Sequence, residues 1–290
     1  MAALRELQRK LESIKALREI VNAMRNLAAI YVRRAESAVK AIRPYTEVVE
    51  TALGVVLDRC GIEGTEAEAE MEGDCMALVF ASDQGLCGTY NDRVVRAALE
   101  FKDGTRGPVE FIAIGRRGGS LLALRGADPI LTVSAPTSLE GIRSQVPELS
   151  ADVFEAFLKR GAHEMVFIYN AYAGMGRSEE TVRPVLPPRR DQLGAARGPQ
   201  FRCEPILTAS PDELLGDLAE EYFFIQLYRA LLEGHASENG ARLLAMTAAS
   251  SNIDDSLAEL TKDYQSARQD AITGELLDVV GGAEALREQV

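Results

Sequence analysis

Two glycine-containing segments are the first places where this chain could do chemistry, because each follows an apolar run typical of a buried strand. The first, SDQGLCG, follows Ala77–Ala81 and carries Gly85 and Gly88. The second, AIGRRGGSLLAL, precedes an expected helix and has glycines at Gly115, Gly118 and Gly119. A phosphate-binding loop needs glycines where the backbone meets the ligand and a helix N-terminus aimed at it. Neither segment completes a nucleotide-binding fingerprint, so the residues favour strand-to-helix turns and leave a nucleotide site as the alternative.

No other group of side chains predicts a catalytic or metal site. Cys87 is a potential nucleophile, but the sequence places no base beside it, which favours a small buried residue. His163 and His235 have no evident acid, base or second metal ligand at a suitable spacing. The acidic run EGTEAEAEMEGD, residues 63–74, is irregularly spaced and favours a solvated linker over a metal site. We therefore predict no catalytic residue, no metal and no cofactor.

The composition argues against several classes of protein. The 290 residues include 44 acidic and 32 basic side chains, and the net charge of −12 argues against nucleic-acid binding. Basic residues concentrate near the N-terminus, so partners of that segment are expected to present acidic surfaces. The four cysteines are far apart and form no C-x-x-C, as expected in a reducing compartment. No apolar run approaches the roughly 20 residues that cross a bilayer, so any membrane role is peripheral and through a partner.

Both ends of the chain carry the three-and-four spacing of a coiled-coil seam. Between residues 4 and 42 the apolar positions keep this spacing with one slip, from Ile14 to Leu17, and Pro44 is expected to interrupt the helix. Near the C-terminus the spacing runs without a slip from residue 243 to residue 271. The motif SPDE is a typical start for that second helix. At 1.5 Å per residue it is on the order of 100 Å long, so much of it is expected to project from any globular body.

Between the two helices the pattern changes to alternating strands and helices. Strands are expected at MALVFAS, VEFIAIG, PILTVS and EMVFIYNAY, with helices at DRVVRAALEFK, GSLLALRG and SADVFEAFLKRG. ETVRPVLPP is an expected edge strand, because Pro184 lacks a backbone donor. This alternation predicts a mostly parallel, doubly wound α/β sheet of Rossmann-like type.

The resulting organisation has three parts. We expect an N-terminal coiled-coil helix at 1–59, the α/β domain at 75–205 and a C-terminal coiled-coil helix at 210–290. Each helix has an apolar seam and no other evident partner within the chain. Antiparallel pairing of the two helices is therefore favoured over a homodimeric coiled coil, which stays the alternative.

Three stretches carry a resemblance to a known family: LRELQRKLESIKALREIVNAMRNLAA, SDQGLCGTYN and ELTKDYQSARQDAITGELLDVVGGAEAL. Together they resemble the γ subunit of F-type ATP synthases, in the same order and through nearly the whole chain. The resemblance implies a rotor shaft, whose terminal helices form an antiparallel coiled coil inside a hexamer of three α and three β subunits. It places the α/β domain at the foot with ε, on a membrane ring of c subunits that proton or sodium flow turns. It also implies a bacterial protein, peripheral on the cytoplasmic face of the membrane, that makes no covalent bond and holds no nucleotide.

The resemblance further implies which residues touch β. Met24 and Arg25 match the family position that faces an acidic lever of β. Positions that catch loops of β are matched near the C-terminus by Arg268, Gln269 and Thr273, with Glu275 at a neighbouring acidic position. The segment AITGELLDVVGGAEAL, mainly apolar and small, fits a shaft turning in a bearing, and FRCEPILTASPDEL matches the part near the foot.

The chain also departs from the family pattern, at Asn22, Asn26, Ile30, Tyr31, Asn239 and Gly240. These changes cluster in the stretch expected to face β and at the midpoint of the coiled coil. They leave open whether the chain serves a main synthase or a diverged, alternative F-type ATPase. Two readings outside the family are a coiled-coil adaptor with a Rossmann-like head and a nucleotide-dependent enzyme with a helical dimerisation arm.

Overall fold

The structure, a computed structural model, describes residues 2–60, 74–174, 176–189, 193 and 205–287. It contains two compact units: unit 1 is Met1–Leu27 with Leu244–Val290, and unit 2 is Ala28–Leu243. Two long helices, α1 (Ala2–Arg59) and α5 (Pro211–Arg287), contribute residues to both units. Most of the acidic run at 63–74, and Cys203, lie outside the described residues. Within the described part of the chain, no helix has the length and apolar character needed to span a membrane.

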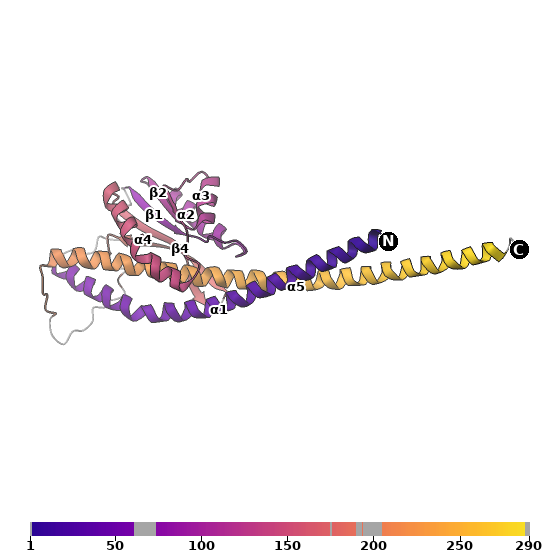
Figure 1. Cartoon of the computed structure of the whole chain (residues 1–290). Helices are drawn as coiled ribbons and strands as arrows, with labels where there is room; N and C mark the ends of the chain where they lie inside the picture. Colours follow the sequence, from indigo (N-terminus) through magenta and orange to yellow (C-terminus); the bar gives the residue numbers. More distant parts are fainter. Residues whose placement is uncertain (1, 61–73, 175, 190–192, 194–204, 288–290) are drawn as a thin grey trace. The chain divides into compact units, whose positions relative to one another are not determined.

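Unit 2 is built on one five-stranded sheet (Figure 1). Its strands are β1 (Cys75–Phe80), β2 (Val109–Ile114), β3 (Leu131–Val133), β4 (Glu164–Gly174) and β5 (Arg177–Leu186). The spatial order is β3-β2-β1-β4-β5, with every neighbouring pair parallel except β4 and β5. The predicted mostly parallel sheet is confirmed, and β5 is the edge strand that Pro184 indicated.

Alternate residues of the central strands point to opposite faces of the sheet and pack in two apolar layers, as expected from a strand's two-residue period. Ala77 and Val79 of β1 pack in one layer with α2 (Tyr90–Gly104) and α3 (Arg116–Leu124). Leu78 and Phe80 pack in the other with α4 (Leu139–Arg160) and the parts of α1 and α5 that belong to unit 2. Helices therefore cover both faces of the sheet, which is the doubly wound arrangement.

Helix α4 is longer than the sequence pattern indicated, since SADVFEAFLKRG begins only at Ser150. It begins at Leu139, where the Ser138 hydroxyl accepts a hydrogen bond from the Gly141 amide at 3.0 Å. Pro147 lies inside the helix, and Gly161 ends it in the left-handed conformation. The cap and the buried side chains on this helix outweigh the local cost of the proline.

The expected break of α1 at Pro44 is wrong, because the helix runs through the proline. A proline removes one backbone hydrogen bond and costs about 3 kcal/mol in a helix interior. Turns on either side are held by burial of Val39, Val49 and Leu53 in the core of unit 2. The Thr46 hydroxyl also donates to the Ile42 carbonyl at 3.2 Å. Tertiary packing of the flanking turns thus keeps the helix continuous.

The C-terminal seam is confirmed, but the slip predicted in α1 is wrong. In unit 1, every α5 position of the seam from 246 to 271 is less exposed than the residues between them. On α1 the seam passes from Ile14, which is partly buried, to the buried Val21 without a slip, and Leu17 is 48% exposed. The intervening heptad position is Arg18, whose guanidinium meets Asp254 of α5 at 2.9 Å. The slip was predicted because Leu17 is apolar. The regular heptad spacing instead puts Arg18 at the seam, where it forms an ion pair.

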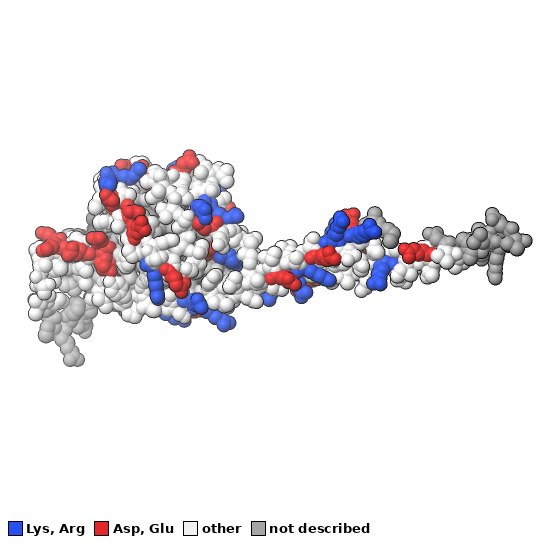
Figure 2. Space-filling model, in the orientation of Figure 1, with Lys and Arg blue, Asp and Glu red and all other residues white. Residues whose placement is uncertain are grey.

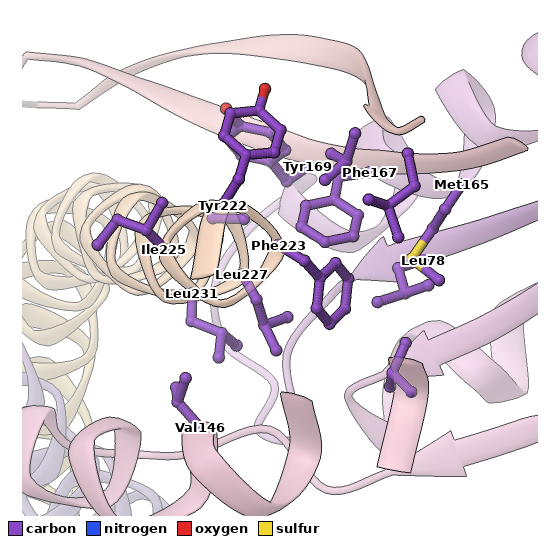
Figure 3. Packing of buried hydrophobic residues seen from close by; sticks show 14 of the residues in the cluster. Leu78, Val146, Met165, Phe167, Tyr169, Tyr222, Phe223, Ile225, Leu227 and Leu231 are labelled. Atoms are coloured by element: carbon purple, nitrogen blue, oxygen red, sulfur yellow. The ribbon is translucent and has the colours of Figure 1, made fainter. Parts of the chain in front are cut away.

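In unit 2, α5 is anchored by aromatic side chains that point at the sheet (Figure 3). Phe223 is fully buried and lies 5.7 Å from the ring centre of Phe167 on β4 and 5.6 Å from that of Phe154 on α4. Tyr222 and Leu227 are buried in the same cluster. This cluster holds the middle of α5 against one face of the sheet.

Candidate functional site

The candidate site is the carboxyl edge of the parallel strands, where doubly wound folds bind ligands. Such ligands occupy the crevice at which the strand order reverses. In this sheet the reversal lies between β1 and β4, because β2 and β3 extend on one side of β1 and β4 on the other. The SDQGLCG segment follows β1 directly, so the first candidate loop is at the crevice.

The polar groups of that loop bind the chain itself. The Asn91 side chain accepts from the Ser82 amide at 2.9 Å and donates to the Ser82 hydroxyl at 2.8 Å. Asp83 Oδ1 accepts from the backbone amides of Arg116 and Ala135, at 2.8 and 3.0 Å. Burial works to raise the pKa of Asp83, but these hydrogen bonds outweigh it and the pKa is lowered. Asp83 therefore connects the loop after β1 to the start of α3 and to the segment that follows β3.

The glycines of AIGRRGGSLLAL have steric roles. Gly115 has a φ of +112°, and a Cβ there would lie 2.5 Å from the Ala81 carbonyl oxygen. A Cβ on Gly118 would lie 2.2 Å from the Ala81 Cβ, and one on Gly119 would lie 2.7 Å from the Thr132 hydroxyl. The glycines let α3 approach the ends of β1 and β3 closely. This supports the turn interpretation of the segment.

Helix α5 occupies the crevice between the strand ends and the loop. The Tyr90 hydroxyl donates to the Gly234 carbonyl at 3.1 Å, and Arg242 Nη2 donates to the Gly85 carbonyl at 3.4 Å. A cavity of about 20 Å³ is left, lined by residues at the strand ends and by Gly234, His235 and Glu238. That is the room of about one water molecule, whereas small-molecule sites measure hundreds of cubic ångströms. The cavity bounded by these residues is therefore too small for a nucleotide.

Buried titratable groups surround this contact. Glu238 pairs with Arg242 at 2.6 Å; burial raises the pKa of Glu238, and Arg242 acts against that rise. Burial, with a smaller contribution from Arg242, lowers the pKa of His235 to about 4. Burial also raises the pKa of Cys87, the opposite of the lowering that activates a nucleophilic thiol. Among the described residues, no three His, Cys, Asp or Glu side chains are grouped as metal ligands would be.

The residues expected to touch β lie on the helix pair of unit 1. Met24 and Arg25 are half-buried on α1, while the α5 residues are exposed: Arg268, Gln269, Thr273 and Glu275. The contacts Arg18–Asp254 and Asn22–Ser250, the latter at 3.2 Å, show that α1 and α5 run antiparallel in a fixed register. By that register Arg268 lies opposite about residue 4 of α1. The structure therefore separates the expected residues into two groups at different levels of the helix pair.

The far end of α5 exposes an apolar surface, formed by Ile272, Leu276, Leu277, Val279 and Val280. In the same register these residues lie beyond the start of α1, so among the described residues no α1 side chain covers them. An exposed group of large apolar side chains is typical of a surface that meets another protein. This surface falls within the segment AITGELLDVVGGAEAL.

These features define a class of protein: a stalk protein whose terminal helices form an antiparallel coiled coil, with an α/β domain inserted between them in the sequence. A sequence model of the family described as ATP synthase matches residues 3–286. The chain is 32% identical to the ATP synthase gamma chain of Geotalea daltonii, across 99% of this chain and all of that relative. It is also 32% identical, with the same coverage, to the ATP synthase gamma chain of Desulforamulus reducens. The chain belongs to the ATP synthase gamma-chain family.

Solved structures share the fold. A chain of the Euglena gracilis mitochondrial ATP synthase, in a structure of its OSCP, F1 and c-ring, has a TM-score of 0.67 at 15% identity. That match covers 98% of this chain and 95% of the other. A chain from the central stalk and c-ring of the Tetrahymena thermophila enzyme has a TM-score of 0.60 at 21% identity, covering 80% and 99% of the two chains.

Proposed function

We propose that this chain is the central rotor shaft of an F1Fo ATP synthase. As the γ subunit it couples ion flow through a membrane c ring to ATP synthesis or hydrolysis on the β subunits, by rotation. The observation that carries the proposal is the full-length relationship to ATP synthase gamma chains, on a structure whose terminal helices form one antiparallel pair. No step of the chemistry is assigned to this chain, which acts by presenting different surfaces to β in each orientation.

A shaft must keep one register under load, and the helix pair of unit 1 has two means of doing so. The apolar seam buries Leu11, Val21 and Met246 between the helices. The Arg18–Asp254 ion pair and the Asn22–Ser250 hydrogen bond join the helices at defined positions. A shift by one heptad would break both polar contacts while preserving the seam, so these contacts select the register. Asn22, which departs from the family pattern, thus contributes to it.

We further propose that the two groups of exposed or half-buried residues contact β at two levels. Met24 and Arg25 face the acidic lever of β, where the guanidinium can pair with carboxylates. The group near the C-terminus, formed by Arg268, Gln269, Thr273 and Glu275, contacts loops of β. Their separation along the antiparallel pair supports two distinct contacts rather than one. The apolar surface of Ile272 to Val280 turns within the bearing of the hexamer, where its lack of strong charge limits adhesion.

The foot of the shaft is proposed to lie in unit 2, facing ε and the c ring. A groove of about 780 Å³ is lined mainly by apolar side chains of α1, of the segment 205–208 and of α5, including Ile206, which is 90% exposed. Acidic side chains gather beside the start of α5, including Asp212, Glu213 and Asp217 (Figure 2). An apolar groove with charged surroundings suits a protein partner. We propose that these partners hold the chain as a peripheral protein on the cytoplasmic face of a bacterial membrane.

The test is purification of the full chain from its source with its associated proteins. A rotor shaft co-purifies with α, β and ε subunits and with ATPase activity. Purification with unrelated proteins would instead favour a coiled-coil adaptor, and purification alone with saturable nucleotide binding would favour an enzyme.

A chain ending at Asp270 provides the matched functional test in the assembled complex. It lacks the apolar surface and the Thr273 and Glu275 contacts, while unit 2 stays complete. We expect ATP-driven ion pumping by the complex to fall severalfold. The isolated shortened chain is expected to keep the cooperative urea unfolding of unit 2. Pumping equal to that of the full chain would contradict the bearing role.

A further inference from the structure

One stretch of α5 is enclosed on all sides. Every residue from Ala230 to Ser237 is buried, whereas the helix in unit 1 buries only its seam. Successive helix residues point about 100° apart, so an unbroken buried run has packing partners in every direction. At this stretch the helix is packed between the α/β domain and other elements of unit 2.

The enclosing partners come from three separate elements. The His235 ring lies 6.0 Å from that of Tyr31 on α1. The Gly234 carbonyl accepts from Tyr90 at the start of α2. Gly240 faces the β4–β5 hairpin, where a Cβ would lie 3.4 Å from the Gly176 amide nitrogen, an ordinary van der Waals contact.

Directional polar contacts add to this enclosure. Arg242 and Glu238 form an ion pair with side chains only 8% and 14% exposed. Arg242 also donates to the Asn239 side chain at 3.0 Å and to the Gly85 carbonyl at 3.4 Å. The contacts with Glu238 and Asn239 lie within α5 and hold the guanidinium in position.

The hydrogen bonds from Arg242 to Gly85 and from Tyr90 to Gly234 join α5 to the rest of the domain. Because hydrogen bonds depend on angle as well as distance, rotation of the helix about its own axis would break these two together. An apolar contact alone tolerates such rotation far better.

Two departures from the family pattern belong to this site. The Asn239 amide donates to the His235 carbonyl at 2.9 Å and its oxygen accepts from Arg242, so it holds the guanidinium in place. Gly240 is a poor helix former that lies against the hairpin, at a distance where a Cβ would also fit.

We infer that Gly234–Arg242 of α5 and the SDQGLCG loop form a torsional clamp, which fixes the rotation of α5 about its axis relative to the α/β domain. The clamp occupies the crevice that other doubly wound folds give to a ligand. Its role in transmitting torque rests on the proposed function, whereas the clamp itself is a property of unit 2. Glu238, Asn239 and Arg242 are positioning residues in this inference.

Hydrogen exchange of the isolated full chain tests the clamp directly. Arg242→Gln removes the ion pair and the fork of donors, and we expect exchange of the amides from Ser82 to Asn91 to become at least tenfold faster. Asn239→Ala, a milder change that keeps the ion pair, is expected to speed the same amides by a smaller factor. The control is Lys159→Gln, which breaks an exposed ion pair of the same spacing with Glu155 on α4, and it should leave the loop unchanged. Loop exchange unchanged in a folded Arg242→Gln or Asn239→Ala chain would overturn the clamp.

The assembled complex tests whether the clamp carries torque. We expect Arg242→Gln and Asn239→Ala to lower ions pumped per ATP hydrolysed at least threefold, with ATP hydrolysis within twofold of the unaltered complex. Faster loop exchange with unchanged pumping per ATP would overturn the torque-bearing role. Failure of the proposed function is distinguishable, because the unaltered chain would then fail to assemble with α and β while the exchange results stand.

Discussion

His235 makes the stability of unit 2 depend on pH in a defined direction. Burial, then Arg242, lowers its pKa to about 4, while Glu140 acts in the opposite sense. An exposed histidine has a pKa near 6.5, so the unfolded chain takes up a proton at higher pH than the folded chain does. The stabilisation from the neutral ring is complete above about pH 6.5 and is lost as pH falls towards 4.

The size of the effect follows from that difference in pKa. Each pKa unit corresponds to about 1.4 kcal/mol, which gives about 3 kcal/mol in full and about 2 kcal/mol between pH 7 and pH 5. The groups around the ring modify the total. The raised pKa of Glu238 increases the stability of unit 2 as pH falls, whereas the lowered pKa of Asp83 decreases it. A variant comparison is therefore needed to isolate the histidine.

We therefore compare the unaltered chain with His235→Gln by urea unfolding at pH 7 and pH 5. Tyr90, Tyr169 and Tyr222 are buried in unit 2, so tyrosine fluorescence follows its unfolding. The unaltered chain is expected to lose about 2 kcal/mol more than the variant between the two pH values. His163→Gln, which changes the exposed second histidine of the chain, is the control. Equal pH dependence of the unaltered chain and His235→Gln would refute the reasoning.

Three further outcomes are expected. Phe223→Ala leaves a cavity between α5 and the sheet and should lower the free energy of unfolding of unit 2 by about 3–5 kcal/mol in urea titration, while Phe224→Ala, which is only partly buried, should cost less. Glu180 pairs with Arg93 at 2.6 Å, which lowers its pKa to about 2; Glu180→Gln should cost about 1–2 kcal/mol at pH 7 and little at pH 2, and an equal cost at both would contradict the pairing. Calorimetry of the isolated chain should show no saturable ATP binding, since α5 fills the crevice, and stoichiometric binding there would revive the enzyme interpretation.

The sequence predicted those elements whose signal is local and repeated. The seam of α5 was found because small and apolar residues recur at the right spacing over many turns. The slip in α1 was wrong for a specific reason: Leu17 looks like a seam residue, but Arg18 holds the heptad position through its contact with Asp254. The break at Pro44 was wrong because the cost of one lost hydrogen bond is local, whereas the burial of Leu53 and its neighbours that offsets it is tertiary.

The clamp could not be predicted in the same way. The sequence shows Gly240 only as a poor helix former. It does not show that Gly240 lies against Gly176, which belongs to a different element far away in the chain. Arg242 and Gly85 are separated still further, and neither has a neighbour in sequence that announces the contact. The glycines of AIGRRGG carried a clear signal of close approach, but the approaching group, Ala81, was evident only in the fold.

The buried Glu238–Arg242 pair is better explained by geometry than by stability. Replacing a buried ion pair with apolar residues of similar volume is often neutral or stabilising, because desolvation offsets the attraction. A shaft that only needed to stay folded would gain little from such a pair at the centre of its domain. A shaft that turns under load needs each helix held at one angle, and a pair tied to Gly85 of the loop after β1 specifies that angle. In this fold α5, rather than a ligand, contacts the loop and the helix that follow β1. These contacts fix the position of the helix on the sheet.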